Sequence, residues 1–587
     1  MRRDSCQKTL RVFNGEVAEM AKSNPCDPED IALKAFFIGT HAENKEFFQH
    51  QVDSLIQSWM LWRSQNYSMD GTGISKEDQE SMGFKEATLR FSKTFQGLIR
   101  RFEKEIPAYS PHYVSHMLSE STTPAILGHL LALLHNPNNV TRDASSVGLE
   151  IEREAVAMLA KMLNFSGEPQ ACGHFTSGGT LANFEALSRA LKRQLHWIQT
   201  ELISNGPSGD WLQKCAHRGW KNSAEKPSHF PSLVEISHRI SKNCGFNWRP
   251  RVILPESAHY SWEKIVALLG LGSETLIYVP LQQDGKMDVE VLNQVLKDEI
   301  QKGSTIVAVV SIVGSTELGA IDAIDEIQKA LDAWRIEHGI HIWHHVDAAY
   351  GGFFACCPIH ELSAPWHASL REGFRFVNSV TLDPHKLGYV PYSAGAVLVR
   401  DPRDYFLFMP DAPYIDADSY WPGAQTIEGS RPATGSTAFW LSAQAIGLDE
   451  SGYGRLLLLT LKQKKLFETL LSEDSRFLMM PGCHSNLSAF AIRKTSADKS
   501  KLSINNAKVQ KLIEESQRGI LGYRISTTRF KLERHLWLKN FLIQNSFEID
   551  SDYLHVVRLV FMNPFIGSKE SRVRHVNEIV KKFQSAI

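Results

Sequence analysis

The sequence places a lysine and an aspartate where side-chain chemistry is expected. Lys386 lies between two apolar runs, 376–382 and 396–399, in a loop rich in glycine and proline. We expect the two runs to be strands that this loop joins. A lysine at the mouth of two buried strands loses solvation, which lowers the pKa of its ammonium group and makes the amine a Schiff-base nucleophile at neutral pH. A solvated loop lysine is the alternative when Lys386 is considered alone.

Asp347 is the second residue of this pair. It ends a short apolar run in the segment 341–352, HIWHHVDAAYGG, and small residues and a glycine pair follow it. The carboxyl ends of the strands form the ligand crevice of an α/β sheet, so an aspartate and a lysine at two such ends can face one ligand. The pair suits pyridoxal 5'-phosphate (PLP), because a lysine holds its aldehyde and an aspartate keeps its pyridine nitrogen protonated.

A glycine-rich turn upstream is suited to a phosphate group. A short apolar segment precedes Ser177-Gly178-Gly179-Thr180, and a segment with helical periodicity follows these four residues. Glycines let the backbone approach a phosphate, and a helix N-terminus offers free N–H groups and a positive dipole end. Such turns are common, so this one indicates a phosphate site only together with the aspartate and the lysine.

Two four-residue motifs carry a family resemblance, Asp347-Ala348-Ala349-Tyr350 and Asp383-Pro384-His385-Lys386. With them the chain resembles the group II PLP-dependent amino-acid decarboxylases, which include glutamate, aromatic-amino-acid and tyrosine decarboxylases, from about residue 110 to residue 563. The resemblance implies an α/β protein of the fold-type I PLP-dependent transferase fold. Its large domain would contain a doubly wound, mainly parallel sheet, and a small C-terminal α+β domain would follow.

The resemblance also implies which residues contact the cofactor. His259 would lie flat against the PLP ring, Thr316 would lie near the 3-hydroxyl, and His385 would join the glycine turn at the phosphate. A helix beginning just after His259 favours a neutral imidazole that can stack. The full set of expected cofactor contacts is Lys386, Asp347, His259, Ser177, Gly178, Gly179, Thr180, Thr316, Ala349 and His385.

Two further residues are matched to roles in the substrate reaction. The turn-rich segment 401–421 resembles the mobile catalytic loop of these decarboxylases, and in it Tyr414 is the candidate that protonates Cα after CO₂ leaves. His116 matches a substrate-contacting histidine of a bacterial tyrosine decarboxylase. The alternatives are an ordinary loop-packing tyrosine and a capping or surface histidine. The expected catalytic residues are therefore Lys386, His259 and Tyr414, with His116 in substrate binding.

Three segments are expected to position these residues. They are an N-terminal helical segment at 1–145, a PLP-binding large domain at 146–440 with a surface insertion at about 200–249, and a small C-terminal domain at 441–587. Apolar residues recur at helical spacing over 47–62, which predicts a helix that packs one face into a core.

Composition and charge narrow the class of protein. Apolar residues make up 43% of the chain, charged residues 22%, and the formal net charge is −1. No nucleic-acid or membrane partner is expected from such a balance. The eight cysteines show no CxxC spacing and the N-terminus has no apolar signal region, which favours a cytoplasmic protein with free thiols. His341, His344 and His345 lack an accompanying acidic or cysteine ligand set, so no metal site is expected.

The resemblance implies decarboxylation of an L-amino acid to an amine and CO₂, in a homodimer with the site at the subunit interface. L-Tyrosine is the favoured substrate, and glutamate, aspartate or another aromatic amino acid are the alternatives. Another fold-type I PLP reaction such as transamination, and a pseudoenzyme that only binds partners, are the competing classes. Four stretches resemble bacterial tyrosine decarboxylases more than glutamate decarboxylases and so favour tyrosine: HYSWEK (259–264), GSTELGAID (314–322), TLDPHKLGYVPYSAG (381–395) and HNPNNVT (135–141).

Overall fold

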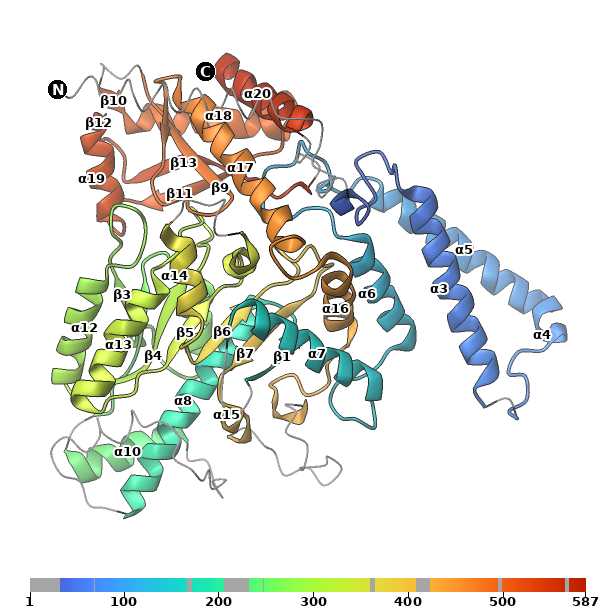
Figure 1. Ribbon diagram of the computed structural model, residues 1–587, viewed down its shortest axis with the longest axis horizontal. Coiled ribbons are helices and arrows are strands. Elements are labelled where there is room, and N and C mark those ends of the chain that lie inside the picture. The colour runs from blue at the N-terminus through green and yellow to red at the C-terminus, as the bar shows by residue number, and fades with distance from the viewer. Residues whose placement is uncertain are drawn as a thin grey trace.

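The computed structural model describes most of the chain. The described residues are 32–67, 69–165, 171–204, 232–245, 247–358, 365–407, 423–494, 499–564 and 569–587. They form a large domain, a smaller domain built around the C-terminal part of the chain, and a pair of N-terminal helices beside the large domain (Figure 1). Within these residues no helix is both long and apolar enough to cross a membrane.

A mixed sheet forms the centre of the large domain. Its seven strands in the described residues follow the spatial order β1 (Cys172–Thr176), β7 (Gly395–Val399), β6 (Ser379–Leu382), β5 (His344–Asp347), β4 (Thr305–Ile312), β2 (Pro250–Pro255) and β3 (Leu276–Val279). β7 runs antiparallel to β6 and β1, whereas the pairs from β6 to β3 are parallel. All eight residues of β4 are buried, as expected for a strand covered on both faces. The expected mainly parallel sheet is confirmed.

Helices cover both faces of this sheet, because alternate side chains of each strand point to opposite sides. Val252 and Leu254 of β2 pack with α8 (Gly179–Ser204), while Ile253 packs with α12 (Val289–Gln301) and α13 (Ile324–His338). Helices α6 (Thr123–His135), α7 (Ser146–Met162), α14 (Pro365–Gly373) and α16 (Thr434–Ile446) extend the second layer, and α11 (Ser261–Leu268) and α10 (Leu233–Cys244) extend the first. The large domain is therefore doubly wound, as expected.

The small domain contains an antiparallel sheet and helices. The strand order is β11 (Ser526–Lys531), β13 (Tyr553–Val560), β9 (Leu487–Ile492) and β8 (Phe477–Met479). The helices are α17 (Tyr453–Ser472), α18 (Leu502–Gln517), α19 (Leu536–Gln544) and α20 (Lys569–Ala586). This is the expected α+β arrangement. The boundaries of the three segments remain predictions, and the one at residue 440 falls inside α16.

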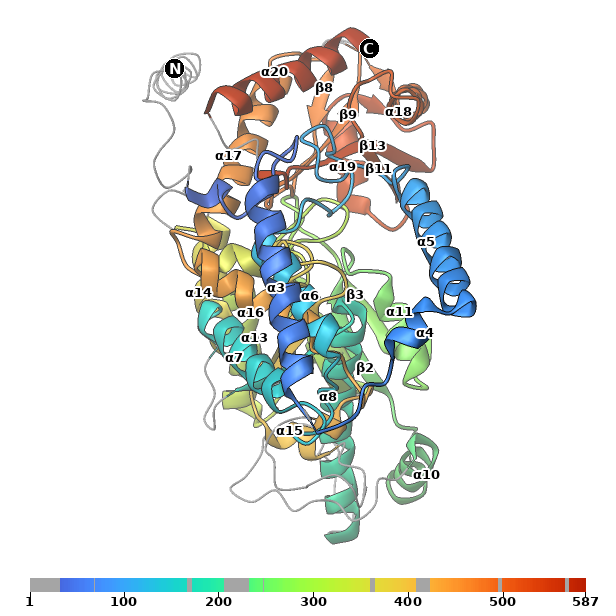
Figure 2. The same cartoon turned by 90° about the vertical axis from the view of Figure 1, so that its right-hand side faces the viewer.

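The N-terminal helices differ from the expectation. α3 (Lys45–Gln65) and α5 (Met82–Phe102), joined by the short α4 (Lys76–Glu80), contain no buried residue. The apolar stripe of α3 was expected to enter a core, but Phe47 is 55% exposed and Trp62 is 48% exposed. α5 stands away from the rest of the molecule in both views (Figures 1 and 2). The face of α3 that carries Val52, Ile56 and Trp59 is half-buried, and Trp62 packs on His135 of α6 with ring centroids 4.7 Å apart. The stripe therefore packs on another helix, as predicted, but not in a fully buried core.

A close approach between β7 and the glycine turn leads to the first prediction. A Cβ at Gly395 would lie 2.5 Å from the Cα of Gly178, so Gly395→Ala must push the two segments apart. Overpacking of this kind costs about 1–3 kcal/mol, and we expect the free energy of unfolding in urea to fall by that amount. Gly97→Ala is the control, because a Cβ there meets nothing within 4 Å. Equal stability of Gly395→Ala and wild type would contradict the close approach.

The second prediction concerns His344, which is fully buried on β5. Burial lowers the pKa of His344 to about 3. The unfolded chain takes up this proton near pH 6.5 and the folded protein does not, so stability falls as the pH falls from about 6.5 towards 3. The contribution is up to about 1.4 kcal/mol per pH unit. We expect His344→Gln to reduce this slope in denaturation curves measured at a series of pH values, and the exposed His338→Gln to leave it unchanged. An unaltered slope in His344→Gln would contradict the prediction.

Candidate active site

A cavity of about 820 Å³ lies at the carboxyl ends of the central strands. In the sheet, Asp347 at the end of β5 pairs with Ile312 at the end of β4 on one side and with Thr381 of β6 on the other. The following loop brings Lys386 to the same edge. The residues expected to contact the cofactor all line this cavity, namely Ser177, Gly178, Gly179, Thr180, His259, Thr316, Asp347, Ala349, His385 and Lys386.

The glycine turn opens the cavity at the start of α8. Gly179 is the first residue of that helix, so unpaired N–H groups of its first turn lie at the cavity wall. A Cβ on Gly179 would lie 3.0 Å from the Cβ of Ala349 and 3.0 Å from a carboxylate oxygen of Asp383, so no larger side chain fits. This combination of a close backbone and a helix N-terminus suits a phosphate.

His385 closes the same end of the cavity. Its Nδ1 accepts a hydrogen bond from the backbone N–H of Ala394 at 3.2 Å, and its ring stacks against Tyr392 with centroids 4.0 Å apart. Burial lowers the pKa of His385, although Asp383 acts in the opposite direction. A neutral ring with Nδ1 as acceptor carries its hydrogen on Nε2, which makes that nitrogen a donor.

Lys386 differs from the sequence-based expectation. Burial by itself lowers the pKa of its ammonium group, as the sequence predicted, but the charge and hydrogen bond of Asp383 and the charge of Asp347 raise it overall. Nζ lies 2.9 Å from the Asp383 carboxylate. The prediction of a lowered pKa is therefore wrong for the protein without cofactor, because an anion three residues earlier in the chain compensates for the lost solvation.

Asp347 is buried and lies opposite this lysine. One carboxylate oxygen accepts a hydrogen bond from Asn183 Nδ2 at 2.7 Å, and the other accepts one from the Ala349 backbone N–H at 3.3 Å. Burial raises the pKa of Asp347, and the Lys386 charge opposes that rise. A buried carboxyl group with a raised pKa gains most from a further cation, and the protonated ring nitrogen of PLP is such a cation.

His259 lines the same cavity as these two charged groups and lies just before α11. Its Nδ1 is 2.8 Å from Ser261 Oγ and 3.3 Å from the Ser261 backbone nitrogen, which fixes the ring. The pKa of His259 is lowered chiefly by burial, with the opposing charges of Asp347 and Lys386 as smaller causes. The imidazole is thus neutral, as the sequence predicted, but burial rather than the helix end is the main reason. A neutral flat ring at this position suits stacking on an aromatic cofactor.

Of the two residues predicted to act on the substrate, one lies away from the cavity and the other is not among the described residues. His116 is exposed and does not line it, and burial and the nearby Arg558 lower its pKa. Tyr414 lies outside the described residues. Neither role is tested by the structure, and both remain predictions.

Other residues of the cavity were missed from the sequence. Asn183 was not predicted to belong to the site, yet its side chain holds Asp347. Four residues after Gly179, it shares the helix face that points to the cavity, and this spacing was the available signal. Tyr392, Ser257 and Ile427 also line the cavity. Tyr392 and Ser257 lie near Lys386 and His259 in the sequence, but their residue types alone gave no signal, and Ile427 is distant from every motif.

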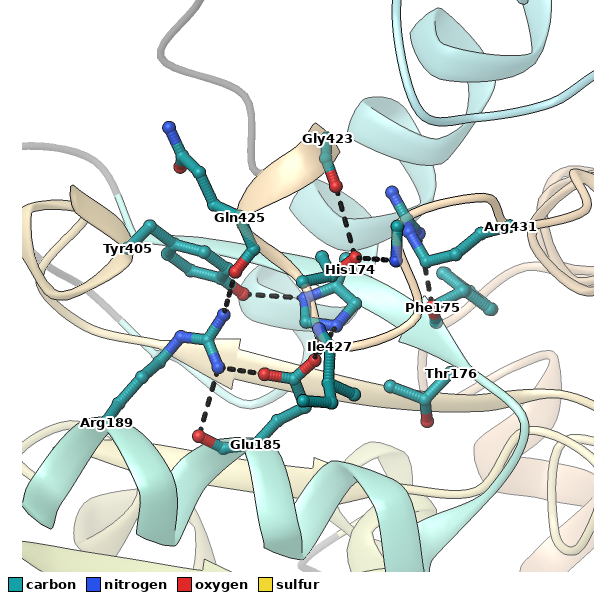
Figure 3. A network of polar contacts seen from close by, with 12 residues as sticks. His174, Phe175, Thr176, Glu185, Arg189, Tyr405, Gly423, Gln425, Ile427 and Arg431 are labelled. Carbon is teal, nitrogen blue, oxygen red and sulfur yellow. Dashed lines mark hydrogen bonds and ion pairs between the residues drawn. The ribbon is translucent and has the colours of Figure 1, made fainter. Parts of the chain in front are cut away.

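A buried polar network behind the glycine turn holds Ile427 in place (Figure 3). Glu185 of α8 forms an ion pair with Arg189 and accepts a hydrogen bond from the Ile427 backbone N–H at 2.7 Å. Arg189 also donates to the Gln425 carbonyl at 3.1 Å. His174 of β1 lies 3.4 Å from Glu185. Fully paired buried charges of this kind are costly to break, so they keep one wall of the cavity rigid.

The lysine, the buried carboxylate, the neutral histidine and the glycine turn therefore surround one cavity, and their chemistry fits PLP. In the described residues no group of three or more histidine, cysteine, aspartate or glutamate side chains is arranged to hold a metal ion.

Comparisons with known proteins agree with this chemistry. Residues 229–493 match the family described as the pyridoxal-dependent decarboxylase conserved domain. An L-tyrosine decarboxylase of Levilactobacillus brevis is 29% identical over 476 residues, which are 74% of this chain and 74% of that protein. An L-2,4-diaminobutyrate decarboxylase of Acinetobacter baumannii is 26% identical over 62% of each chain.

A solved structure confirms the fold. The crystal structure of Oryza sativa TDC with PLP and tryptamine superimposes with a TM-score of 0.64 at 16% identity and covers 96% of this chain and 99% of that one. At this level of identity the similarity concerns the fold, which is the expected fold-type I arrangement. With the matched domain, the relatives and the cavity together, the chain contains a pyridoxal-dependent decarboxylase domain at residues 229–493 and is a PLP-dependent amino-acid decarboxylase.

Proposed function

We propose that the enzyme converts L-tyrosine to tyramine and CO₂. The observation that carries this proposal is the similarity to an L-tyrosine decarboxylase over about three quarters of both chains. The cavity supports it, because its wall includes the apolar side chains of Phe184, Ile265, Leu268 and Ile427. No arginine is found among its described lining residues, although a side-chain carboxylate such as that of glutamate is usually bound by one.

Each cavity residue has a proposed part in this reaction. Lys386 holds the cofactor aldehyde, Asp347 keeps the proton on the ring nitrogen, and His259 covers one ring face. Bound PLP supplies the electron sink for the electron pair that the departing CO₂ leaves on Cα. Residues 177–180 and His385 bind the phosphate, so that the cofactor is held at both ends.

The remaining steps concern orientation and proton transfer. The bond from Cα to the carboxylate must stand perpendicular to the cofactor ring, and holding the substrate in that pose can contribute several kcal/mol to the rate, within the ~7–11 kcal/mol range of positioning effects. Tyr414 is proposed to return a proton to Cα and to exclude water, and His116 to contact the substrate. The products are then tyramine and CO₂.

The third prediction tests reaction and substrate together. Purified enzyme with PLP is offered tyrosine, phenylalanine, DOPA, glutamate, aspartate and 2,4-diaminobutyrate, and both CO₂ and amine are measured. We expect tyramine from tyrosine, and we expect Lys386→Ala to reduce it to the background rate because the cofactor attachment is lost. Lys329→Ala is the matched control, since that lysine is 75% exposed on α13.

The outcomes of this assay separate the alternatives. Release of CO₂ mainly from glutamate, aspartate or diaminobutyrate would contradict the tyrosine proposal and leave the decarboxylase reaction intact. Formation of a keto acid without CO₂ would indicate transamination. Lysine-dependent binding of PLP with no turnover of any amino acid would favour a protein that only binds.

We further propose that the enzyme is a homodimer whose N-terminal helices pack on the partner subunit. α5 presents one continuous apolar face, with Phe91 69% exposed, Phe95 50% exposed and Phe102 66% exposed. Exposed apolar patches of this size are typical of protein interfaces. A second copy of the chain is the proposed partner, because the family resemblance places the site at a subunit interface.

The fourth prediction concerns this face. The double substitution Phe91→Glu and Phe95→Glu places charges in the proposed interface, so we expect the mass measured by light scattering to fall from dimer to monomer. Lys85→Glu on the same helix is the control and should remain dimeric. A wild-type monomer, or a double variant that stays dimeric, would contradict the proposal.

A further inference from the structure

Asp347 lies at the end of a chain of buried hydrogen bonds that runs along the α8 face of the sheet. Trp343 Nε1 lies 2.8 Å from Ser379 Oγ, and Ser379 Oγ lies 2.8 Å from His345 Nδ1. His345 Nε2 lies 3.0 Å from Asn183 Oδ1, and Asn183 Nδ2 lies 2.7 Å from the Asp347 carboxylate. The four linked side chains are at most 5% exposed.

The direction of every hydrogen bond in this chain follows from its two ends. An indole nitrogen can only donate, and an ionised carboxylate can only accept. Asn183 therefore turns its NH₂ group to Asp347 and its carbonyl oxygen to His345, whose Nε2 must carry the hydrogen. A neutral His345 then accepts at Nδ1 from the Ser379 hydroxyl, which itself accepts from Trp343.

The surroundings keep His345 in this state. Burial lowers its pKa to about 3, so the ring is neutral near pH 7. The neighbouring His344 points to the other side of the strand, where its partners are Ser311 at 2.6 Å and Gln328 at 2.8 Å. The two histidines are thus equally buried on one strand, and only one of them is linked to Asp347.

We propose that His345, Asn183 and Ser379 are positioning residues that orient the Asp347 carboxylate and keep it ionised for the protonated ring nitrogen of the cofactor. The inference rests on the proposed contact of Asp347 with that nitrogen. Without His345 the Asn183 carbonyl oxygen loses its hydrogen-bond donor, and the amide can then turn that oxygen towards Asp347. A carbonyl oxygen beside the carboxyl group favours the protonated, uncharged form, which no longer attracts the ring nitrogen.

The fifth prediction measures this effect through binding rather than turnover. The cofactor-free full chain is titrated with PLP and with its 1-deaza analogue, in which carbon replaces the ring nitrogen. In His345→Phe we expect the affinity for PLP to fall about tenfold, because a buried charge-assisted contact is weakened. The affinity for the analogue should remain as in wild type, since the analogue has no ring nitrogen to contact Asp347.

Three further variants make the result decisive. His344→Phe is the matched control and should bind both compounds as wild type does. His345→Gln retains an amide donor towards Asn183 and should recover most of the preference for PLP. This variant therefore tests the positioning role even if His345→Phe fails to fold. Asp347→Asn should remove the preference for PLP over the analogue altogether.

The outcomes distinguish the two levels of the proposal. Equal weakening of PLP and the analogue in His345→Phe, or unchanged binding of both, would overturn the positioning role. A preference for PLP that persists in Asp347→Asn would instead overturn the proposed contact between Asp347 and the ring nitrogen. Neither result depends on which amino acid the enzyme decarboxylates.

Discussion

The burial of a carboxylate beside a buried lysine is the electrostatic constraint on which the cavity depends. Removing Asp347 and Lys386 from water penalises the charged form of each, and each charge partly offsets the penalty on the other. Asp383 stabilises the lysine further. Such a pair persists only where surrounding dipoles and hydrogen bonds are already in place, so the neighbouring elements must be rigid.

The sheet provides that rigidity. Parallel strands bring their carboxyl ends to one edge, which places Asp347 beside the end of β4. The reversal of the chain between β6 and β7 then returns Lys386 and His385 to the glycine turn, where Gly395 almost touches Gly178. Glycine is required at position 395, because a Cβ there would push β7 away from the backbone of Gly178.

The exposed N-terminal helices show that one chain does not satisfy all of its own apolar surface. Periodic apolar residues over 47–62 were sufficient to predict the helix α3 but not to identify what covers it. A hydrophobic stripe indicates that a face will be buried and carries no information about whether the covering surface belongs to the same molecule. The exposed apolar face of α5 is accordingly the surface proposed to pack on the partner subunit.

Local patterns in the sequence determined much of this protein. Buried strands, the glycine turn, the mainly parallel sheet, the family and the PLP chemistry all follow from short motifs, because each depends on neighbouring residues or on the order of elements. The tertiary structure alone decided the contacts between distant segments. It paired Asp347 with Asn183 across 164 positions, and it set the raised pKa of Lys386 through the orientation of Asp383. Charges interact through space, and sequence order does not specify how far apart two side chains will lie.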